Sequence, residues 1–143
     1  MEKTAIRVQL QEQTLAAAKQ VQLPGGIRKA DQVTGSFDVI YNKELIKSPV
    51  VDITNALAGR LTGLYTLQQG ATPGNEQAAL YVRGMGNPLV VIDGIPRPYT
   101  LLNPAEIESV TVLKDALAAN LYGMRASNGA LLINTKKACP VNR

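Results

Sequence analysis

Histidine and tryptophan are absent from this chain of 143 residues, and cysteine occurs once, at Cys139. The lack of histidine excludes the usual Ser-His and Cys-His nucleophile pairs and the usual zinc-ligand sets. A single cysteine makes no disulfide within the chain and no cysteine metal cluster. The usual histidine-activated nucleophiles, the usual zinc sites and cysteine metal clusters are therefore excluded. We predict that the chain is not an enzyme, with no catalytic residue, bound metal or cofactor.

Long apolar runs and clustered charges are also missing. No run of about 18 apolar residues occurs, so no segment is expected to cross a membrane as a helix. The first residues lack the apolar stretch of a secretory signal. The net charge is +4, but the basic pairs Arg28-Lys29 and Lys136-Lys137 stand apart and no aromatic residues interleave with them. Nucleic-acid binding, which usually needs a basic stripe or face, is not expected.

The residues that are present suit one domain with an aliphatic core. Hydrophobic residues make up 45% of the chain and charged residues 18%, and Phe37 is the single phenylalanine. The length allows one domain of modest core size. So low a charged fraction fits a domain enclosed by a polar cavity of a larger partner, and it fits equally a globular domain with long neutral loops.

Residues 1–33 form a glutamine-rich segment with weak patterning. Ile6, Val8 and Leu10 alternate with polar residues, which favours a short strand, whereas residues 15–19 favour extension as a helix. A Pro-Gly-Gly sequence at 24–26 breaks whatever precedes it. We interpret residues 1–33 as a leader or linker, residues 34–137 as the domain, and residues 138–143 as a C-terminal tail.

Within residues 34–137 the pattern predicts short strands and short helices in mixed order. The predicted strands cover residues 36–41, 64–67, 79–82, 89–92, 110–113 and 130–135. The predicted helices cover residues 43–47, 52–57 and 116–121, with Asp52 and Asp115 as N-caps. The expected turn and cap residues are Gly59, Gly84, Asp93, Gly94, Gly123, Asn128 and Gly129. No long crossover helix is present, so the fold class is α+β, a small mixed β-sheet of about four strands with short helices packed against it.

Three features that suggest chemistry have simpler structural interpretations. Asp93-Gly94 after an apolar run predicts a type I′ hairpin turn rather than a catalytic carboxylate. Glu106 and Glu108 flank Ile107 at a turn-to-strand junction, which predicts surface charge or pairing with an arginine rather than acid–base work. Gly84-Met85-Gly86 lacks the third glycine and the helix start of a dinucleotide-binding loop.

Four stretches of the sequence, taken in order and with their spacing, match the motifs of one protein family. They are residues 55–64 (NALAGRLTGL), residues 80–84 (LYVRG), residues 87–96 (NPLVVIDGIP), and residues 103–137 with NP, EIESV, VLKDA, LYG, NG and INTKK. In this order they resemble the plug domain of TonB-dependent outer-membrane transporters, specifically the SusC/RagA-like group of Bacteroidota that imports glycans and peptides.

The resemblance implies a plug that closes the lumen of its own β-barrel, senses ligand and is remodelled through TonB. Its implied partners are that β-barrel, TonB, a surface lipoprotein that lids the barrel, and a glycan or peptide. The implied location is the outer membrane within the parent transporter, the chain alone being soluble, and periplasmic if exported. Residues 1–23 match no TonB-contacting segment, and the chain ends before the barrel that follows Lys137 in the family. The alternative is a freestanding soluble periplasmic or surface binding module with a plug-like fold.

The resemblance also implies roles for particular residues. Loops 69–77 and 97–103 would face ligand, with the candidates Gln69, Thr72, Asn75, Gln77, Arg97, Tyr99 and Asn103. Tyr99 would stack on a sugar ring. An ordinary mobile surface loop is the alternative for both, because the two loops have little to bury. The candidates for docking to the barrel are Arg83, Glu106, Glu108 and Arg125. At Arg83 a guanidinium would hold a carboxylate of the barrel wall.

Overall fold

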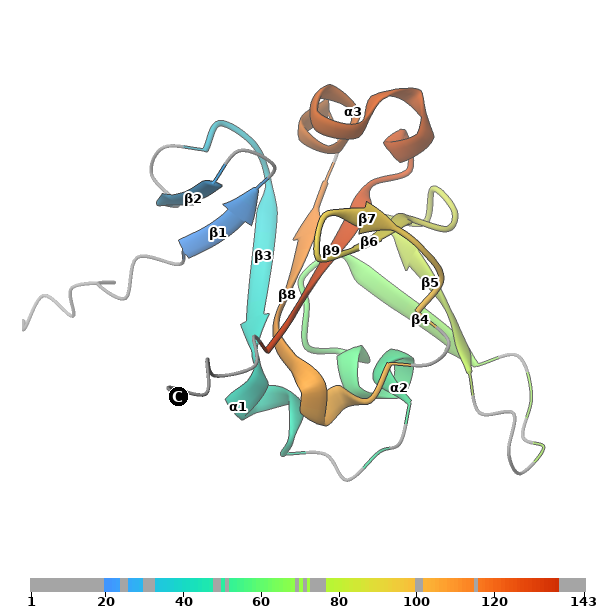
Figure 1. Cartoon of the computed structure of the whole chain (residues 1–143). Coiled ribbons are helices and arrows are strands. Elements are labelled where there is room, and N and C mark those ends of the chain that lie inside the picture. The colour runs from blue at the N-terminus through green and yellow to red at the C-terminus, as the bar shows by residue number, and fades with distance from the viewer. Residues whose placement is uncertain are drawn as a thin grey trace, which may run out of the picture.

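A five-stranded mixed sheet organises the chain in this computed structural model (Figure 1). Its order is β3 (Phe37–Tyr41), β8 (Ile107–Leu113), β9 (Ala130–Thr135), β6 (Leu89–Ile92) and β7 (Ile95–Pro96). The structure describes residues 20–23, 26–29, 33–47, 50, 52–68, 70, 72, 77–99, 102–114 and 116–136. The α+β class with a mixed sheet is therefore confirmed, and β7 adds an edge strand of two residues to the predicted set.

The centre of the sheet is built from three segments rich in Val, Ile and Leu. β9 pairs antiparallel with β8 and parallel with β6. Residues 130–134 of β9 are all buried, because strands lie on both sides of it and both of its faces are covered. These three segments coincide with the strands predicted at residues 89–92, 110–113 and 130–135.

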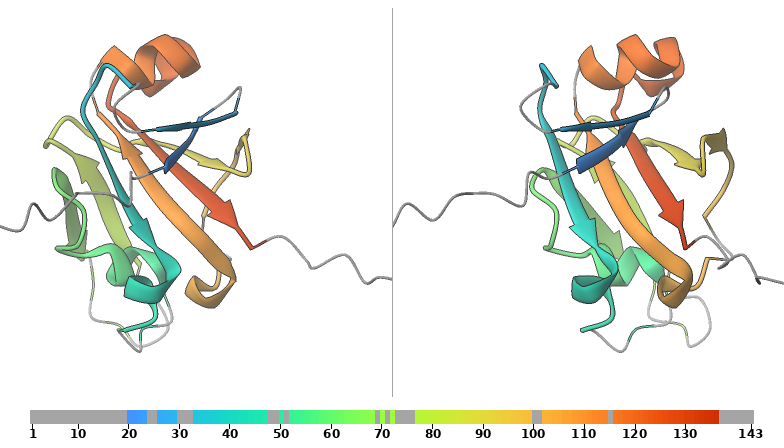
Figure 2. Two further views of the ribbon diagram at one scale, coloured as in Figure 1. Left: turned by 90° about the vertical axis from the view of Figure 1, so that its left-hand side faces the viewer. Right: turned by 60° about the vertical axis from the view of Figure 1, so that its left-hand side comes forward.

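One face of the sheet carries the larger core. Against it pack α1 (Asn42–Leu45), α2 (Ile53–Leu57), and a ribbon of two antiparallel strands, β4 (Leu64–Gln68) and β5 (Ala78–Val82). The side chains buried there include Ile40, Leu45, Leu57, Leu80, Ile92, Ile107, Val110, Leu131 and Ile133. Figure 2 shows α2 and the ribbon together on this side of the sheet. Burial of such aliphatic area, at about 25 cal/mol per Å², is the main stabilising contribution.

The other face carries a second core beneath α3 (Ala116–Tyr122) and the short helix η3 (Gly123–Ala126). Its buried members are Val91, Leu113, Ala118, Ala126, Ala130 and Leu132. Leu23 packs against this core from β1 (Gln20–Leu23), which pairs antiparallel with β2 (Gly26–Lys29). In Figure 2 these two strands lie on the side of the sheet opposite the β4–β5 ribbon. The linker interpretation of residues 1–33 did not include this strand pair, although the break predicted at 24–26 separates the two strands.

The backbone is in the left-handed region at several of the expected turn and cap positions. The expected glycines at 59, 84, 94, 123 and 129, together with Asp93, have positive φ. Asp52 occupies the N-cap position of α2, but its side chain makes no capping hydrogen bond. Asp115 lies outside the described residues. A different aspartate, Asp38, ties β3 to the turn before β4, because its Oδ2 accepts hydrogen bonds from Thr62 N at 2.9 Å and Thr62 Oγ1 at 2.8 Å.

The helices in the described part of the chain are all too short to span a membrane. The edge strands of the main sheet are β3 and β7, and β7 consists of Ile95 and Pro96 alone.

Gly129 offers a direct test of the packing between the two cores. Its φ is +96°, and a Cβ there would lie 3.0 Å from Val82 Cγ1 and 3.1 Å from the Leu113 carbonyl oxygen. We expect Gly129→Ala to lower the free energy of unfolding by about 3 kcal/mol, through strain plus overpacking. Gly59→Ala is the matched control, because Gly59 has φ +69° with nothing within 4 Å, and about 1 kcal/mol is expected there. Urea denaturation measures both, and equal losses would contradict this packing.

Candidate functional site

The turn between β6 and β7 does more than reverse the chain. Asp93 (φ 51°) and Gly94 (φ 86°) join the paired residues Ile92 and Ile95, which confirms the predicted hairpin. In addition, Asp93 Oδ1 accepts a hydrogen bond from Thr135 N and Oδ2 accepts one from Thr135 Oγ1, both at 2.8 Å. Arg97 Nη2 lies 3.6 Å from the same Oδ2. The side chain of the turn residue is thus a contact between the hairpin and the end of β9.

The segment that follows β7 is partly buried, contrary to expectation. Tyr99 and Leu102 pack against the larger core, so the assumption that this loop has little to bury is wrong at these two positions. Burial raises the pKa of the Tyr99 phenol above its usual value, and the nearby carboxylate of Asp52 raises it further. Asn103 Oδ1 accepts a hydrogen bond from Ala105 N at 2.9 Å, which makes Asn103 the cap of the short helix η2 (Pro104–Glu106).

The second candidate ligand loop joins β4 to β5. Of its candidates, Thr72 is exposed and Gln77 is half-buried, whereas Gln69 and Asn75 lie outside the described residues. The strand register places this loop at the end of the ribbon where Gln68 pairs with Ala78. Arg83 follows the opposite end, where Leu64 pairs with Val82. The ribbon therefore separates a candidate ligand loop from a candidate docking residue.

The four docking candidates are all exposed, and the structure divides them between two ends of the domain. Arg83 (φ 51°) and Gly84 form a tight turn in which Met85 N donates to Val82 O at 3.0 Å. This turn lies against the one after η3, because a Cβ on Gly86 would lie 3.0 Å from Asn128 Nδ2. Arg125 belongs to η3, so the two arginines stand on neighbouring turns.

The two glutamates lie at the other end of β8. Glu106 and Glu108 flank Ile107, which is fully buried, so both carboxylates point to the opposite side from the core, as expected. β8 starts here and runs to Leu113, which precedes α3. The basic and acidic candidates therefore mark opposite ends of the main sheet.

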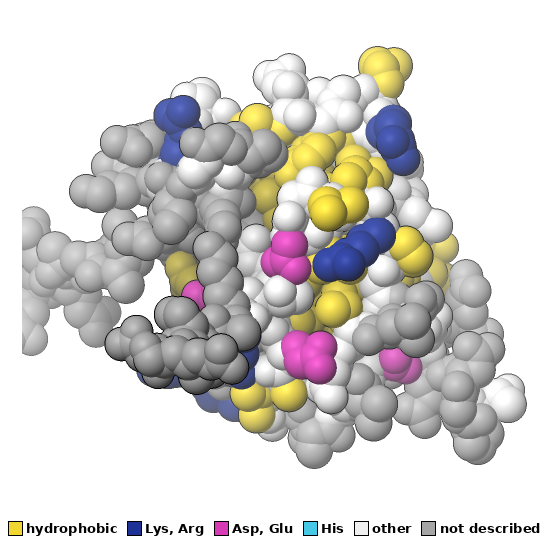
Figure 3. All heavy atoms as spheres, in the orientation of Figure 1, with side chains coloured by type: hydrophobic (Ala, Val, Ile, Leu, Met, Phe, Trp, Pro, Cys, Tyr) yellow, Lys and Arg dark blue, Asp and Glu magenta, His cyan; other side chains and the backbone are white. Residues whose placement is uncertain are grey.

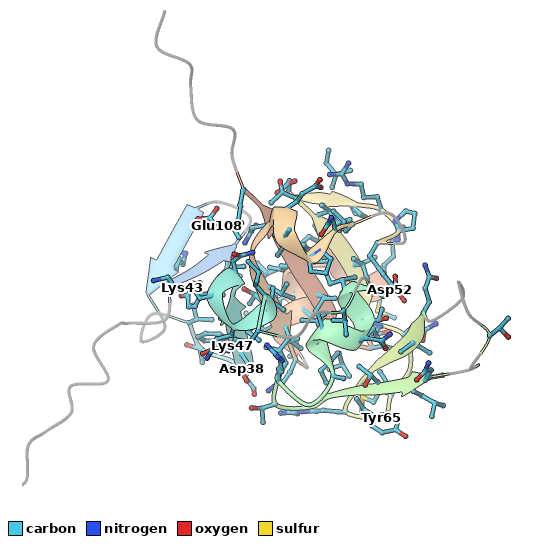
Figure 4. All side chains as sticks on the ribbon, turned by 90° about the horizontal axis from the view of Figure 1, so that it is seen from below. Asp38, Lys43, Lys47, Asp52, Tyr65 and Glu108 are labelled. Carbon is cyan, nitrogen blue, oxygen red and sulfur yellow. The ribbon has the colours of Figure 1, made fainter. Side chains whose placement is uncertain are left out.

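The outer face of the β4–β5 ribbon is an exposed apolar surface that sequence reasoning missed. Tyr65 pairs with Tyr81, their ring centroids 6.2 Å apart, and Leu67 pairs with Ala79. Tyr65 is 56% and Leu67 is 44% exposed. Figure 4 shows Tyr65 on the outer side of the ribbon, directed away from the main sheet. The sequence carries a signal for this surface: a half-exposed strand normally places polar residues on its outer face, whereas the outer positions here hold Tyr65, Leu67, Ala79 and Tyr81.

Other chemistry is sparse on the described surface. In the orientation of Figure 3, apolar side chains gather between α3 and β7, with basic and acidic side chains scattered among them. Among the described residues no group of three or more side chains with the right atoms for a metal ion occurs. The described surface therefore offers exposed charged side chains at both ends of the main sheet and an apolar flank on the β4–β5 ribbon.

Comparisons with known proteins identify the family. The family model described as TonB-dependent Receptor Plug Domain matches residues 29–130. The TonB-dependent receptor SusC of Bacteroides thetaiotaomicron is 37% identical, over 79% of this chain and 13% of that protein. A TonB-dependent receptor of Formosa agariphila is 32% identical, over 80% of this chain and 12% of that protein.

A solved structure agrees. The RagAB peptide importer in its open-open state matches with a TM-score of 0.74 at 32% identity, over 86% of this chain and 14% of that chain. The shared fold, the matched length and the motif order define the class, a plug domain of the SusC/RagA-like type. This chain belongs to the TonB-dependent receptor plug domain family. It spans about one eighth of the length of the curated relatives it matches.

The environment of Tyr99 predicts a pH dependence. Because its pKa is higher in the folded than in the unfolded chain, the stability that it contributes is present below the unfolded pKa of about 10 and is lost as the pH rises through the folded value. We expect the free energy of unfolding to fall less steeply above about pH 10 in Tyr99→Phe than in the wild type. Tyr41→Phe, at an exposed position, is the control. Denaturant unfolding at several pH values between about pH 8 and pH 11 measures this dependence for the three proteins. About equal slopes of the free energy of unfolding against pH would contradict the assignment.

Proposed function

We propose that this chain is the plug of a TonB-dependent outer-membrane transporter for glycan or peptide nutrients, closing and gating the lumen of its own β-barrel. The observation that carries the proposal is the match of the chain, over most of its length, to one short region of proteins named as TonB-dependent receptors. The RagAB match supports the SusC/RagA-like type, and RagAB itself is a peptide importer. TonB, a surface lipoprotein and the nutrient are the further partners that we propose.

The surface described above suits enclosure by a barrel. Inner walls of transmembrane barrels are polar, and guanidinium and carboxylate groups pair well with such walls. Arg83 and Arg125 stand at one end of the domain and Glu106 and Glu108 at the other, so the four residues give docking points along its length. The Tyr65–Tyr81 pair adds an apolar flank whose phenolic groups are compatible with a polar wall.

The ligand side of the proposal rests on the segments after β7 and between β4 and β5. Arg97 is exposed and offers a guanidinium, and Tyr99 offers an aromatic ring whose position is fixed by packing against the core. Thr72, Gln77 and Asn103 add polar side chains. A residue fixed by the core keeps its geometry without ligand, which lowers the entropy cost of binding.

A barrier assay tests the plug function. Residues 33–137 replace the plug region of the Bacteroides SusC barrel, and entry of vancomycin, which intact outer membranes exclude, is measured in cells carrying each form. The barrel with its plug deleted should admit the antibiotic, and the chimera should restore exclusion to at least about 90% of the SusC level, because a folded plug fills the lumen.

The matched control for that assay is the chimera with Gly129→Ala, which should leak because its plug is destabilised. Leakage through an unsubstituted chimera that reaches the membrane at normal levels would overturn the plug assignment. In that case ligand binding by the isolated chain would favour the freestanding binding module instead.

The proposal includes the absence of catalysis. Plug domains act by position and not by turnover, and the chain has no histidine to activate a nucleophile. Purified chain should show no hydrolysis of polysaccharide, peptide or ester substrates above buffer. Turnover that follows the chain through successive purification steps would contradict this expectation.

A further inference from the structure

The side chain of Asp93 in the β6–β7 turn contacts Thr135, the last residue of β9, beyond the point where the backbone pairing of β6 with β9 ends. The parallel register of β6 with β9 ends at Ile92 and Ile133, and Asp93 N donates to Ile133 O at 3.0 Å. The chain then reverses at Gly94. Two residues further along β9, the Asp93 carboxylate accepts the hydrogen bonds of Thr135 N and Thr135 Oγ1, both at 2.8 Å. The carboxylate thereby extends the contact between β6 and β9 to the strand end.

Thr135 lies where the chain leaves the sheet. On its other side the register of β9 with β8 is interrupted between Ile107 and Ser109, so the ladder there is irregular. The next residue, Lys136, donates its N–H to Glu106 O at 2.8 Å. The two charge-assisted hydrogen bonds that the Asp93 carboxylate accepts therefore restrain Thr135 beside an irregular part of the β8–β9 ladder.

Arg97 acts on the same carboxylate oxygen. Asp93 Oδ2, which accepts from Thr135 Oγ1, lies 3.6 Å from Arg97 Nη2. The Arg97 side chain is 50% exposed, so a ligand from solvent has access to it. A guanidinium beside a carboxylate attracts it and restrains its rotamer. A ligand that engages Arg97 therefore changes the restraint on the group that holds Thr135.

We propose that Asp93 is a positioning residue that couples Arg97 to the C-terminal end of β9. Contact of an anionic or amide-bearing ligand with Arg97 loosens the Asp93 carboxylate, and Thr135 and Lys136 become less restrained. The contact with ligand rests on the proposed function, whereas the link through Asp93 rests on the hydrogen bonds alone. A turn residue without this role would need no side-chain acceptor, because Gly-Gly also suits a type I′ turn.

Amide hydrogen exchange of the full chain, resolved by NMR, tests the link. Asp93→Gly keeps a residue that accepts positive φ and removes the carboxylate, so Thr135 should exchange about tenfold faster. Asp93→Asn keeps the turn and a side-chain acceptor, so it should restore protection to within about threefold of the wild type. Two control amides are Val112 N in β8 and Thr62 N, which donates to the carboxylate of Asp38. Their exchange rates should stay within about twofold of the wild type, which would exclude a global loss of stability.

The coupling itself is tested with Arg97→Gln in two backgrounds. In the wild type this substitution should speed exchange at Thr135 about threefold, and in Asp93→Asn it should have no effect, because the charge through which it acts is gone. Arg125→Gln, at an exposed arginine on η3, is the control and should leave Thr135 unchanged in both backgrounds.

Two results would overturn the inference. One is an unchanged Thr135 exchange rate in Asp93→Gly, which would mean that the carboxylate does not restrain the strand end. The other is an Arg97→Gln effect of equal size in both backgrounds, which would mean that Arg97 acts by another route. Neither measurement involves a barrel or a ligand. Failure here leaves the plug assignment intact, and a leaking chimera leaves this link intact.

Discussion

Burial of both faces of β9 is the constraint on which the rest of the domain depends. A strand that lies between β8 and β6 and has apolar residues at every position from 130 to 133 needs a cover on each side of the sheet. The β4–β5 ribbon with α1 and α2 supplies one cover, and α3 with η3 supplies the other. Each cover is small, so the fold reaches two cores with short helices and without the long crossovers of a doubly wound sheet.

Local patterns predict the parts of this fold that local physics decides. The runs at 89–92, 110–113 and 130–133 are apolar enough to be strands wherever they are placed, and Asp-Gly sets its own turn. Local patterns do not predict the β1–β2 pair or the two-residue β7, because these elements depend on contacts with other parts of the chain. Neither has enough apolar residues to be recognised alone, and each exists because a neighbouring element supplies the other half of its contacts.

The candidate site also contains both residues that local sequence predicts and residues whose contacts it does not predict. Asp93 was predicted as a turn residue from its neighbour Gly94, but its hydrogen bonds reach Thr135, which is 42 residues away in sequence. No spacing rule relates two such positions, because the contact arises from the parallel pairing of β6 with β9. Tyr99 likewise looked like a loop residue, and its packing follows from the path of the chain over the larger core. Glu106 and Glu108 are exposed on either side of the buried Ile107, as expected for a turn-to-strand junction, which is a local feature of the sequence.

Pro96 at the margin of the main sheet has a consequence for how the chain behaves among other strands. An open sheet edge is a row of unpaired N–H and C=O groups on which another chain can add a strand. β7 is two residues long and ends in a residue without an N–H, so it presents almost no template for such addition. Strand exchange between copies, or the start of a fibril, is therefore disfavoured at this edge, whatever the concentration of β-rich neighbours around it.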